Sequence, residues 1–316
     1  MGVYYLSDEE RKEVLRGLLP RSRELGVTEE LRGWNWFQPP LEPPFAVRPA
    51  MHEVANRYCP TARDLYLRRV CKVRVQPNSA MVAGSYLHGI AAAAILEAKR
   101  LIYSMGVARH REIIASLTAP PAAGSPGHQD VEDGLSGLSA DDRAQLEGRA
   151  QVLREFQCMR VAARIEDVLA RHPYIGEDSL VALAIPVVTE QRLDGSLLGL
   201  SRNLSSDALT FSEPMICDIK FGERRDFHRL STTGYALVME SIHEYPVNIG
   251  CLVYVRFKGD RVFVERDFHV IDDELRQWFV EERDEKTRLI EEEIDPGVAG
   301  ECPPHCSYAE HCKGTK

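Results

Sequence analysis

Hydrophobic and polar positions divide the chain into a helical first half and a strand-rich second half. Apolar residues recur at helical spacing over residues 7–18, 52–70, 79–105 and 140–172. Ser7 and Ser139 are the expected N-caps of the first and last of these helices. The 52–70 helix should break near Pro60, because proline lacks the N–H that a helix interior needs. Residues 32–45, rich in Pro and Trp, predict an extended segment packed on the surface.

The pattern changes after Pro173. Residues 180–193, 198–211 and 214–222 are apolar or alternating, and turn signals separate them, so we expect three antiparallel strands. A helix over 226–243, a hairpin of 247–257 with 261–270, and a charged helix over 272–294 should follow. The order of elements indicates a mixed α/β core with a helical N-terminal part.

Composition shifts suggest three regions within the 316 residues. Residues 1–78 form a helical region, residues 79–271 form the core, and residues 272–316 form a C-terminal helix with a cysteine-rich tail. Within the core, residues 118–140 are rich in Pro, Gly, Ser and Asp, which is typical of an exposed, flexible insertion.

The apolar runs and the first residues bear on localisation. No run approaches the roughly 18–20 apolar residues of a membrane helix, and the longest, residues 180–188, contains Pro186. The start, MGVYYLSDEE, lacks the basic and apolar regions of a signal peptide. We therefore expect a cytoplasmic protein with no membrane association; its oligomeric state is not indicated.

Charge is distributed unevenly along a chain whose net charge is −9. Residues 57–74 carry six basic side chains against one acid, Asp64, whereas residues 281–293 carry seven acids against three bases. This asymmetry fits a phosphate-binding face on an acidic protein, and a solvated charged helix explains it equally well.

The strand MICDIKFG carries the most informative chemistry. Side chains alternate in a strand, so Asp218 and Lys220 share one face while Cys217, Ile219 and Phe221 share the other. A carboxylate can hold Mg²⁺ or Mn²⁺. The lysine can orient or deprotonate an attacking water, or neutralise charge on a phosphate. A D-x-K pattern alone is weak, because a surface ion pair produces it too.

A second carboxylate should come from the preceding strand. A four-residue loop over residues 212–215 would put Asp207 opposite Lys220 on the same face, whereas a three-residue loop would put it on the wrong face. Asp194 is the alternative, although Asp194-Gly195 is first of all a turn signal. His88, near the start of a helix, is a hypothetical third ligand; a lone helical histidine is more often structural.

The eight cysteines include a cluster in the tail. Cys302, Cys306 and Cys312 follow a C-x3-C-x5-C spacing typical of a metal-binding loop. A fourth thiolate could be Cys59 or, alternatively, Cys71, and His305 or His311 could complete a zinc site instead. Four thiolates suit an iron–sulfur cluster or zinc.

The order of these motifs resembles that of the RecB-like nucleases with the PD-(D/E)xK core of restriction endonucleases. The residues that match are Gly84, His88, Asp207, Asp218, Lys220 and Tyr235. The resemblance implies that His88, Asp207, Asp218 and the Ile219 carbonyl bind the metal, and that Lys220 and Tyr235 belong to the catalytic site. Ser231 stands where the family usually has glutamine, four residues before the tyrosine. His228, Ser231 and Tyr235 should share one helix face near Arg224, Arg225 and Arg229.

Adding the cysteines makes the resemblance more specific. The C-P-x5-Y-L motif at Cys59, three cysteines near the C-terminus and the early RGWNW segment resemble the fourth family of CRISPR-associated proteins, in its archaeal type I-A subgroup. Those proteins are iron–sulfur RecB-like nucleases. The resemblance implies a [4Fe-4S] cluster that joins both chain ends, on Cys59, Cys302, Cys306 and Cys312.

The same resemblance implies a function. We expect a Mn²⁺- or Mg²⁺-dependent exonuclease that acts on single-stranded DNA, or on DNA with single-stranded ends, and processes spacer precursors with the CRISPR spacer integrase. Two alternatives stay open: a non-catalytic, DNA-binding iron–sulfur subunit of the same complex, and a RecB-like DNA-repair nuclease.

Overall fold

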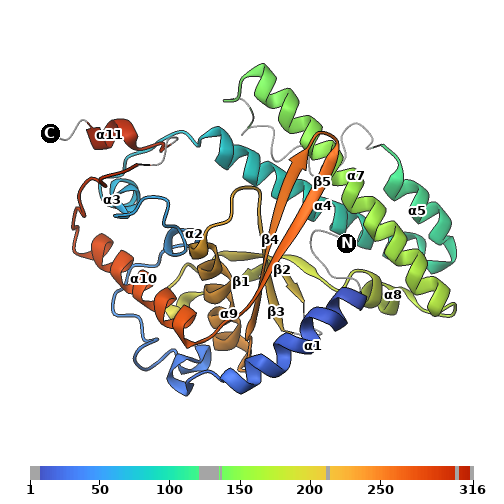
Figure 1. Ribbon diagram of the computed structural model, residues 1–316, viewed down its shortest axis with the longest axis horizontal. Helices are drawn as coiled ribbons and strands as arrows, with labels where there is room; N and C mark the ends of the chain where they lie inside the picture. Colours follow the sequence, from blue (N-terminus) through green and yellow to red (C-terminus); the bar gives the residue numbers. More distant parts are fainter. Residues whose placement is uncertain (1–7, 121–134, 136, 211–213, 303–305, 314–316) are drawn as a thin grey trace.

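A computed structural model describes residues 8–120, 135, 137–210, 214–302 and 306–313 (Figure 1). Its centre is a five-stranded sheet in the order β1-β2-β3-β4-β5. The strands are β1 (Val188–Leu193), β2 (Leu204–Thr210), β3 (Met215–Lys220), β4 (Ile249–Lys258) and β5 (Arg261–Val270). The mixed α/β class is therefore confirmed.

The sheet is mixed. β1, β2 and β3 pair antiparallel, as do β4 and β5, which confirms the two antiparallel groups that the sequence predicted. β3 and β4, however, pair in parallel, with Asp218 beside Leu252 and Lys220 beside Tyr254. Parallel neighbours need a crossover, and here α9 (Arg229–His243) lies in the connection between them.

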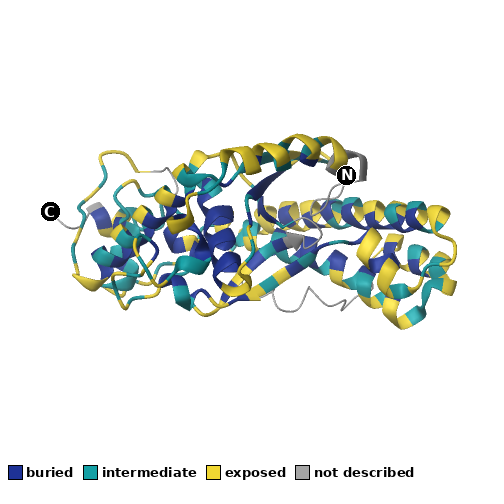
Figure 2. Cartoon of the chain, turned by 90° about the horizontal axis from the view of Figure 1, so that it is seen from below, coloured by how far each residue is buried: buried dark blue, intermediate teal, exposed yellow. Residues whose placement is uncertain are grey.

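α9 packs directly on β3 and β4, and the other helices form two groups, which Figure 1 shows on opposite sides of the strands. One group comprises α4 (Ser79–Met105), α5 (His110–Thr118), α7 (Ala140–Arg171) and α8 (Glu177–Ala184). The other comprises α2 (Met51–Val54), α3 (Arg63–Arg69), α10 (Asp273–Glu291) and α11 (Ala309–Lys313). α1 (Asp8–Leu25) packs against β4 and β5. In Figure 2 the buried positions gather along the strands and on one side of the long helices.

Two hydrophobic cores meet at β3. Met215, Cys217 and Ile219 belong to the core with α4 and α7, whereas Ile216 belongs to the core with α9 and α10. Because side chains alternate in a strand, Asp218 and Lys220 share the face of Ile216. The acid–lysine pair therefore faces α9.

Helix caps account for two boundaries that the sequence predicted correctly. The side chain of Ser139 accepts a hydrogen bond from the N–H of Asp142 at 3.1 Å, and α7 begins directly after it. The side chain of Asn78 accepts one from the N–H of Met81 at 2.9 Å at the start of α4. Each cap satisfies an N–H that has no partner inside the helix. The other expected cap, Ser7, lies outside the described residues.

Several local predictions were wrong. Residues 180–184 belong to α8 instead of a strand; Leu180, Val181 and Ala184 are buried at helical spacing, and Glu177 and Asp178 occupy the first turn. Short apolar runs do not distinguish a buried strand from a helix. The sequence also did not predict α5, and the expected insertion 118–140 falls mostly outside the described residues, which omit 121–134 and 136.

Of the 52–70 and 32–45 segments, the first breaks around Pro60 as expected: it splits into α2 and α3, with Ala62 left-handed at a φ of 59° before α3. The second contains the 3₁₀ turn Gly33–Asn35 and is partly buried, not surface-bound. A Cβ on Gly33 would lie 2.1 Å from the carbonyl oxygen of Leu237, so only glycine allows this approach to α9.

By length and composition, α4 could cross a membrane, which the search for uninterrupted apolar runs did not reveal. It is the one such helix in the described part of the chain, and 39% of its most apolar window is buried. Ile90, Ile95 and Ile102 of α4 pack in the core with α5 and α7. Since core helices pass the same test, the helix is weak evidence for a membrane span.

Candidate active site

Asp207 and Asp218 meet on neighbouring strands. Ala208 pairs with Cys217, so the register continued by one residue sets Asp207 opposite Asp218. The sequence had predicted Asp207 opposite Lys220. The difference is two residues, so Asp207 stays on the expected face. Phe211 and Ser212 of the expected turn lie outside the described residues.

Asp218 is buried and fully engaged. Lys220 Nζ lies 2.7 Å from its Oδ2, and the Ser231 hydroxyl donates to the same oxygen at 3.1 Å. These partners offset the cost of removing the carboxylate from water. Burial lowers the pKa of Lys220, but the charges of Asp218 and Asp207 outweigh it, and the net pKa is raised. Lys220 is therefore an ammonium at neutral pH, suited to stabilising negative charge.

Asp207 is held less tightly. Its Oδ2 accepts a hydrogen bond from the N–H of Ile219 at 2.8 Å and lies 3.4 Å from His88 Nδ1. Burial raises the pKa of Asp207 to about 6, with the Asp218 charge adding to the rise and His88 and Lys220 opposing it. Asp194, the alternative, is exposed and caps its own turn by accepting from the N–H of Ser196 at 2.8 Å. Of these two acids, the structure brings only Asp207 to Asp218.

His88 reaches the carboxylates from α4. Its Nδ1 is buried and, in the described part of the chain, has no hydrogen-bond partner. The 3.4 Å approach to Asp207 is too long for a good hydrogen bond. The ring makes an edge contact with Phe221 at 5.1 Å between centroids. A buried nitrogen without a hydrogen-bond partner, 3.4 Å from the Asp207 carboxylate, suits a metal ligand.

Tyr235 lies beneath the site. The ring is buried, and its hydroxyl donates to the carbonyl of Ser205, on the strand that carries Asp207. Burial raises the pKa of Tyr235, so the phenol stays protonated. This contact supports a positioning role for Tyr235. The face of His228, Ser231 and Tyr235 points inward.

Three aromatic residues form a chain beside the lysine. His228 Nε2 lies 3.1 Å from the Tyr58 hydroxyl, and His228 Nδ1 lies 3.2 Å from the Tyr254 hydroxyl. Burial and the Lys220 charge lower the pKa of His228 to about 4, so it is neutral. Sequence reasoning missed Tyr58 and Tyr254; the only signal for Tyr58 was its place next to Cys59.

The donor set of one imidazole and two carboxylates suits Mg²⁺ or Mn²⁺ chemically. Among the described residues, however, no three His, Cys, Asp or Glu side chains are arranged to hold a metal ion. Lys220 occupies the side of Asp218 Oδ2 that a cation would use. The residue types therefore fit a divalent cation, while in the present arrangement Asp218 is paired with the Lys220 ammonium.

The cysteines of the two chain ends approach one another. Burial raises the pKa of Cys306, and Cys302, Cys59 and Cys312 are close enough to raise it further. Cys71 instead lies beside Tyr66. His305 lies outside the described residues. Among the described residues, the cysteines do not form a group of three that could hold a metal ion.

The basic stretch 57–74 is largely paired with acids. Arg57 lies 3.1 Å from Glu282 of the acidic helix α10, and Arg63 makes a bidentate contact with Asp295. Arg68 and Arg69 both face Glu53. These pairs account for much of the charge asymmetry in the sequence and weaken its interpretation as a phosphate-binding face.

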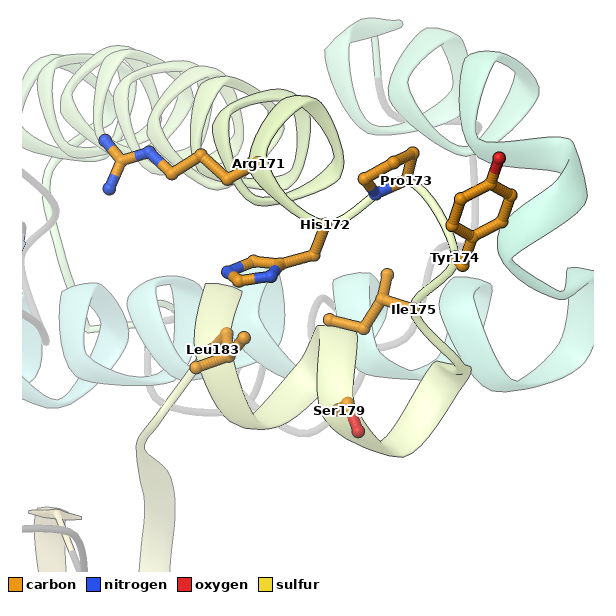
Figure 3. Close-up of a pocket in the computed structure, with 7 residues that line it drawn as sticks. All are labelled: Arg171, His172, Pro173, Tyr174, Ile175, Ser179 and Leu183. Atoms are coloured by element: carbon orange, nitrogen blue, oxygen red, sulfur yellow. The ribbon is translucent and has the colours of Figure 1, made fainter.

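A surface pocket of about 480 Å³ lies elsewhere, at the turn between α7 and α8 (Figure 3). Its lining includes His172, Tyr174 and Leu183, and none of the acid–lysine residues. The chemistry therefore gathers at β2 and β3 and not in this pocket.

Fold and site together define a mixed α/β protein with two carboxylates, a lysine and a histidine converging at neighbouring strands. The family model of CRISPR-associated exonuclease Csa1 matches residues 6–315, and the chain belongs to this family. A relative of that name from Saccharolobus solfataricus is 34% identical over 286 residues, 90% of this chain and 92% of the relative. Another from Thermoproteus tenax is 29% identical over 287 residues, 91% and 92% of the two chains. The expected membership of a CRISPR-associated nuclease family is confirmed.

Proposed function

We propose that this protein is a divalent-metal-dependent DNA exonuclease that trims single-stranded ends of spacer precursors in CRISPR adaptation. The name of its relatives, CRISPR-associated exonuclease Csa1, supports the nuclease class. The observation that carries the proposal is the convergence of His88, Asp207, Asp218 and Lys220 at β2 and β3.

The residues divide the work of phosphodiester hydrolysis. His88, Asp207, Asp218 and the Ile219 carbonyl would hold Mn²⁺ or Mg²⁺, which when bound acts as a Lewis acid and lowers the pKa of water. Lys220, kept protonated by its acidic neighbours, places positive charge where a phosphate would gain negative charge. Tyr235 positions Asp207 indirectly, by donating a hydrogen bond to the carbonyl of Ser205 on the same strand. Ser231 positions Asp218 directly, by donating a hydrogen bond to its carboxylate.

Arginines before α9 offer phosphate contacts. Asp267 holds Arg229 through two hydrogen bonds of 3.0 and 2.9 Å and lies 3.1 Å from Arg224. The side chains of Arg224 and Arg225 are 52% and 51% exposed. Anchored but exposed guanidinium groups suit contacts to a DNA backbone.

We assign a [4Fe-4S] cluster to Cys59, Cys302, Cys306 and Cys312. The proximity of Cys306 to the other three supports this set over one with Cys71. The cluster would tie the tail to the segment that precedes α3. The partner would be the CRISPR spacer integrase complex, in the cytoplasm.

The test is cleavage of single-stranded DNA labelled at the 5′ or the 3′ end, with Mn²⁺, after anaerobic purification. Wild type should shorten one labelled end progressively, and Asp218→Ala should abolish this. Asp194→Ala, which removes an exposed turn carboxylate, is the matched control and should cleave normally. If Asp218→Ala still cleaved DNA and Asp194→Ala did not, the active site would lie elsewhere. DNA binding without cleavage by wild type would favour the non-catalytic subunit, which the present lysine-occupied arrangement also suits.

A further inference from the structure

An exposed tyrosine, packed against a half-buried phenylalanine, is joined to the proposed active site through His228. Tyr58 is 52% exposed, although large aromatic side chains are usually buried. Its ring meets Phe227 edge-on, with centroids 5.0 Å apart and planes at 87°. About half of Tyr58 is thus open to solvent, while its ring packs against Phe227.

Tyr58 is held rigidly from several sides. Its hydroxyl is bound to the buried His228, and its backbone N–H donates to the Asn56 side chain at 2.8 Å. Lys286 of α10 donates to the carbonyls of Val54 and Asn56 at 2.6 and 2.8 Å. A ring fixed in advance loses little conformational entropy when a ligand stacks on it.

Short contacts connect the ring to the acid–lysine pair. The Ser231 hydroxyl lies 2.7 Å from the His228 carbonyl oxygen and 3.1 Å from Asp218 Oδ2. The ring is therefore linked to the Asp218 carboxylate through His228 and Ser231.

We propose that Tyr58, supported by Phe227, is a stacking platform for one unpaired base next to the scissile phosphate. This inference rests on the proposed nuclease function and deepens it, because it assigns single-strand selection to a particular side chain. Bases in a duplex are already stacked and cannot lie on the ring, whereas an unpaired base can. Stacking does not depend on base identity, so the platform reads strandedness and not sequence.

The variants separate the ring from its hydroxyl. Removing an aromatic platform weakens single-strand binding by roughly 5- to 150-fold, and we expect Tyr58→Ala to raise the Kd and KM within that range. Tyr58→Phe keeps the ring and should stay within about threefold of wild type. Tyr174→Ala is the matched control: Tyr174 is fully exposed at the distant α7–α8 turn. Thermal unfolding and visible absorbance report whether fold and cluster are intact.

A substrate-side test needs no variant. An abasic nucleotide is moved one position at a time along a short single-stranded oligonucleotide, and binding is measured by fluorescence anisotropy with Ca²⁺ in place of Mn²⁺. With the wild-type protein, an abasic nucleotide at one position near the cleaved end should lower the affinity as much as Tyr58→Ala does. With Tyr58→Ala, an abasic nucleotide at the same position should cause no further loss of affinity.

The two proposals fail in different ways. An abasic penalty that is equal at all positions, or unchanged in Tyr58→Ala, would overturn the platform even if cleavage occurs normally. Wild type that shows the position-specific penalty yet never cleaves with Mn²⁺ would overturn the nuclease function and leave the platform standing.

Discussion

Replacing Asp207 by asparagine should stabilise the metal-free protein at neutral pH. Folding moves the pKa of this carboxyl from an ordinary 3.8 to about 6, chiefly because the group is buried and secondarily because Asp218 is near. Between those pH values the folded protein binds more protons than the unfolded chain, so its stability falls as the pH rises. Above pH 6 the full cost of keeping the buried carboxylate ionised is present.

The magnitude follows from the shift. A change of about two pKa units corresponds to about 3 kcal/mol. Asparagine is close in shape and can still accept the hydrogen bond from the N–H of Ile219. Because 20% of the Asp207 side chain stays exposed, water screens part of this cost, and Asp207→Asn should gain less than about 3 kcal/mol at pH 8 and almost nothing near pH 4.

The assay is denaturant unfolding with EDTA from about pH 4 to pH 8. Asp194→Asn is the matched control, and it should lower the stability at neutral pH instead of raising it. Hydrogen bonds from Ser196 lower the pKa of Asp194, so folding stabilises the ionised form that asparagine lacks. Adding Mn²⁺ should favour wild type, which keeps both carboxylates. An Asp207→Asn protein that is less stable than wild type at pH 8, or a difference that does not change with pH, would refute the reasoning.

Three further predictions concern the frame of the site. Glu240→Gln should lose about 3–5 kcal/mol, because it leaves Arg276, wholly buried and bound bidentately to Glu240, without its counter-charge; an unchanged unfolding midpoint would contradict this. Gly33→Ala should destabilise the fold because its Cβ would meet the Leu237 carbonyl, whereas Gly17→Ala, in helix α1 with open space around it, should raise stability by up to about 1 kcal/mol by the same measurement. Cys302→Ala should remove the visible absorbance of the cluster; a protein that remains brown would show that Cys302 is not a ligand.

The sequence predicted the elements whose signals are local. Ser139 marks a helix start through its own side chain, and alternation on β3 assigned Asp218 and Lys220 to one face. Asp207 was the better choice over Asp194 for the same kind of reason, because Asp194-Gly195 is a turn signal whatever surrounds it.

What the sequence could not predict depends on tertiary packing. The run beginning at Leu180 is equally apolar as a helix or a strand, and only its burial against the α4–α7 core decides. The two-residue register difference at Asp207 comes from the position of the connection and not from its length: Thr210 pairs with Met215, so four residues separate the paired positions as expected, but one position earlier in the chain. The contact of Tyr58 with His228 joins residues 170 positions apart, and no spacing rule connects them.

The central claim is that the Asp218–Lys220 strand cleaves DNA. Its most direct test is cleavage of end-labelled single-stranded DNA with Mn²⁺ by anaerobically purified wild type and Lys220→Ala, with Lys258→Ala at the distant β4–β5 turn as control. We expect cleavage by wild type and the control, and none by Lys220→Ala although its fold and absorbance are unchanged. Equal cleavage by all three proteins would contradict the claim.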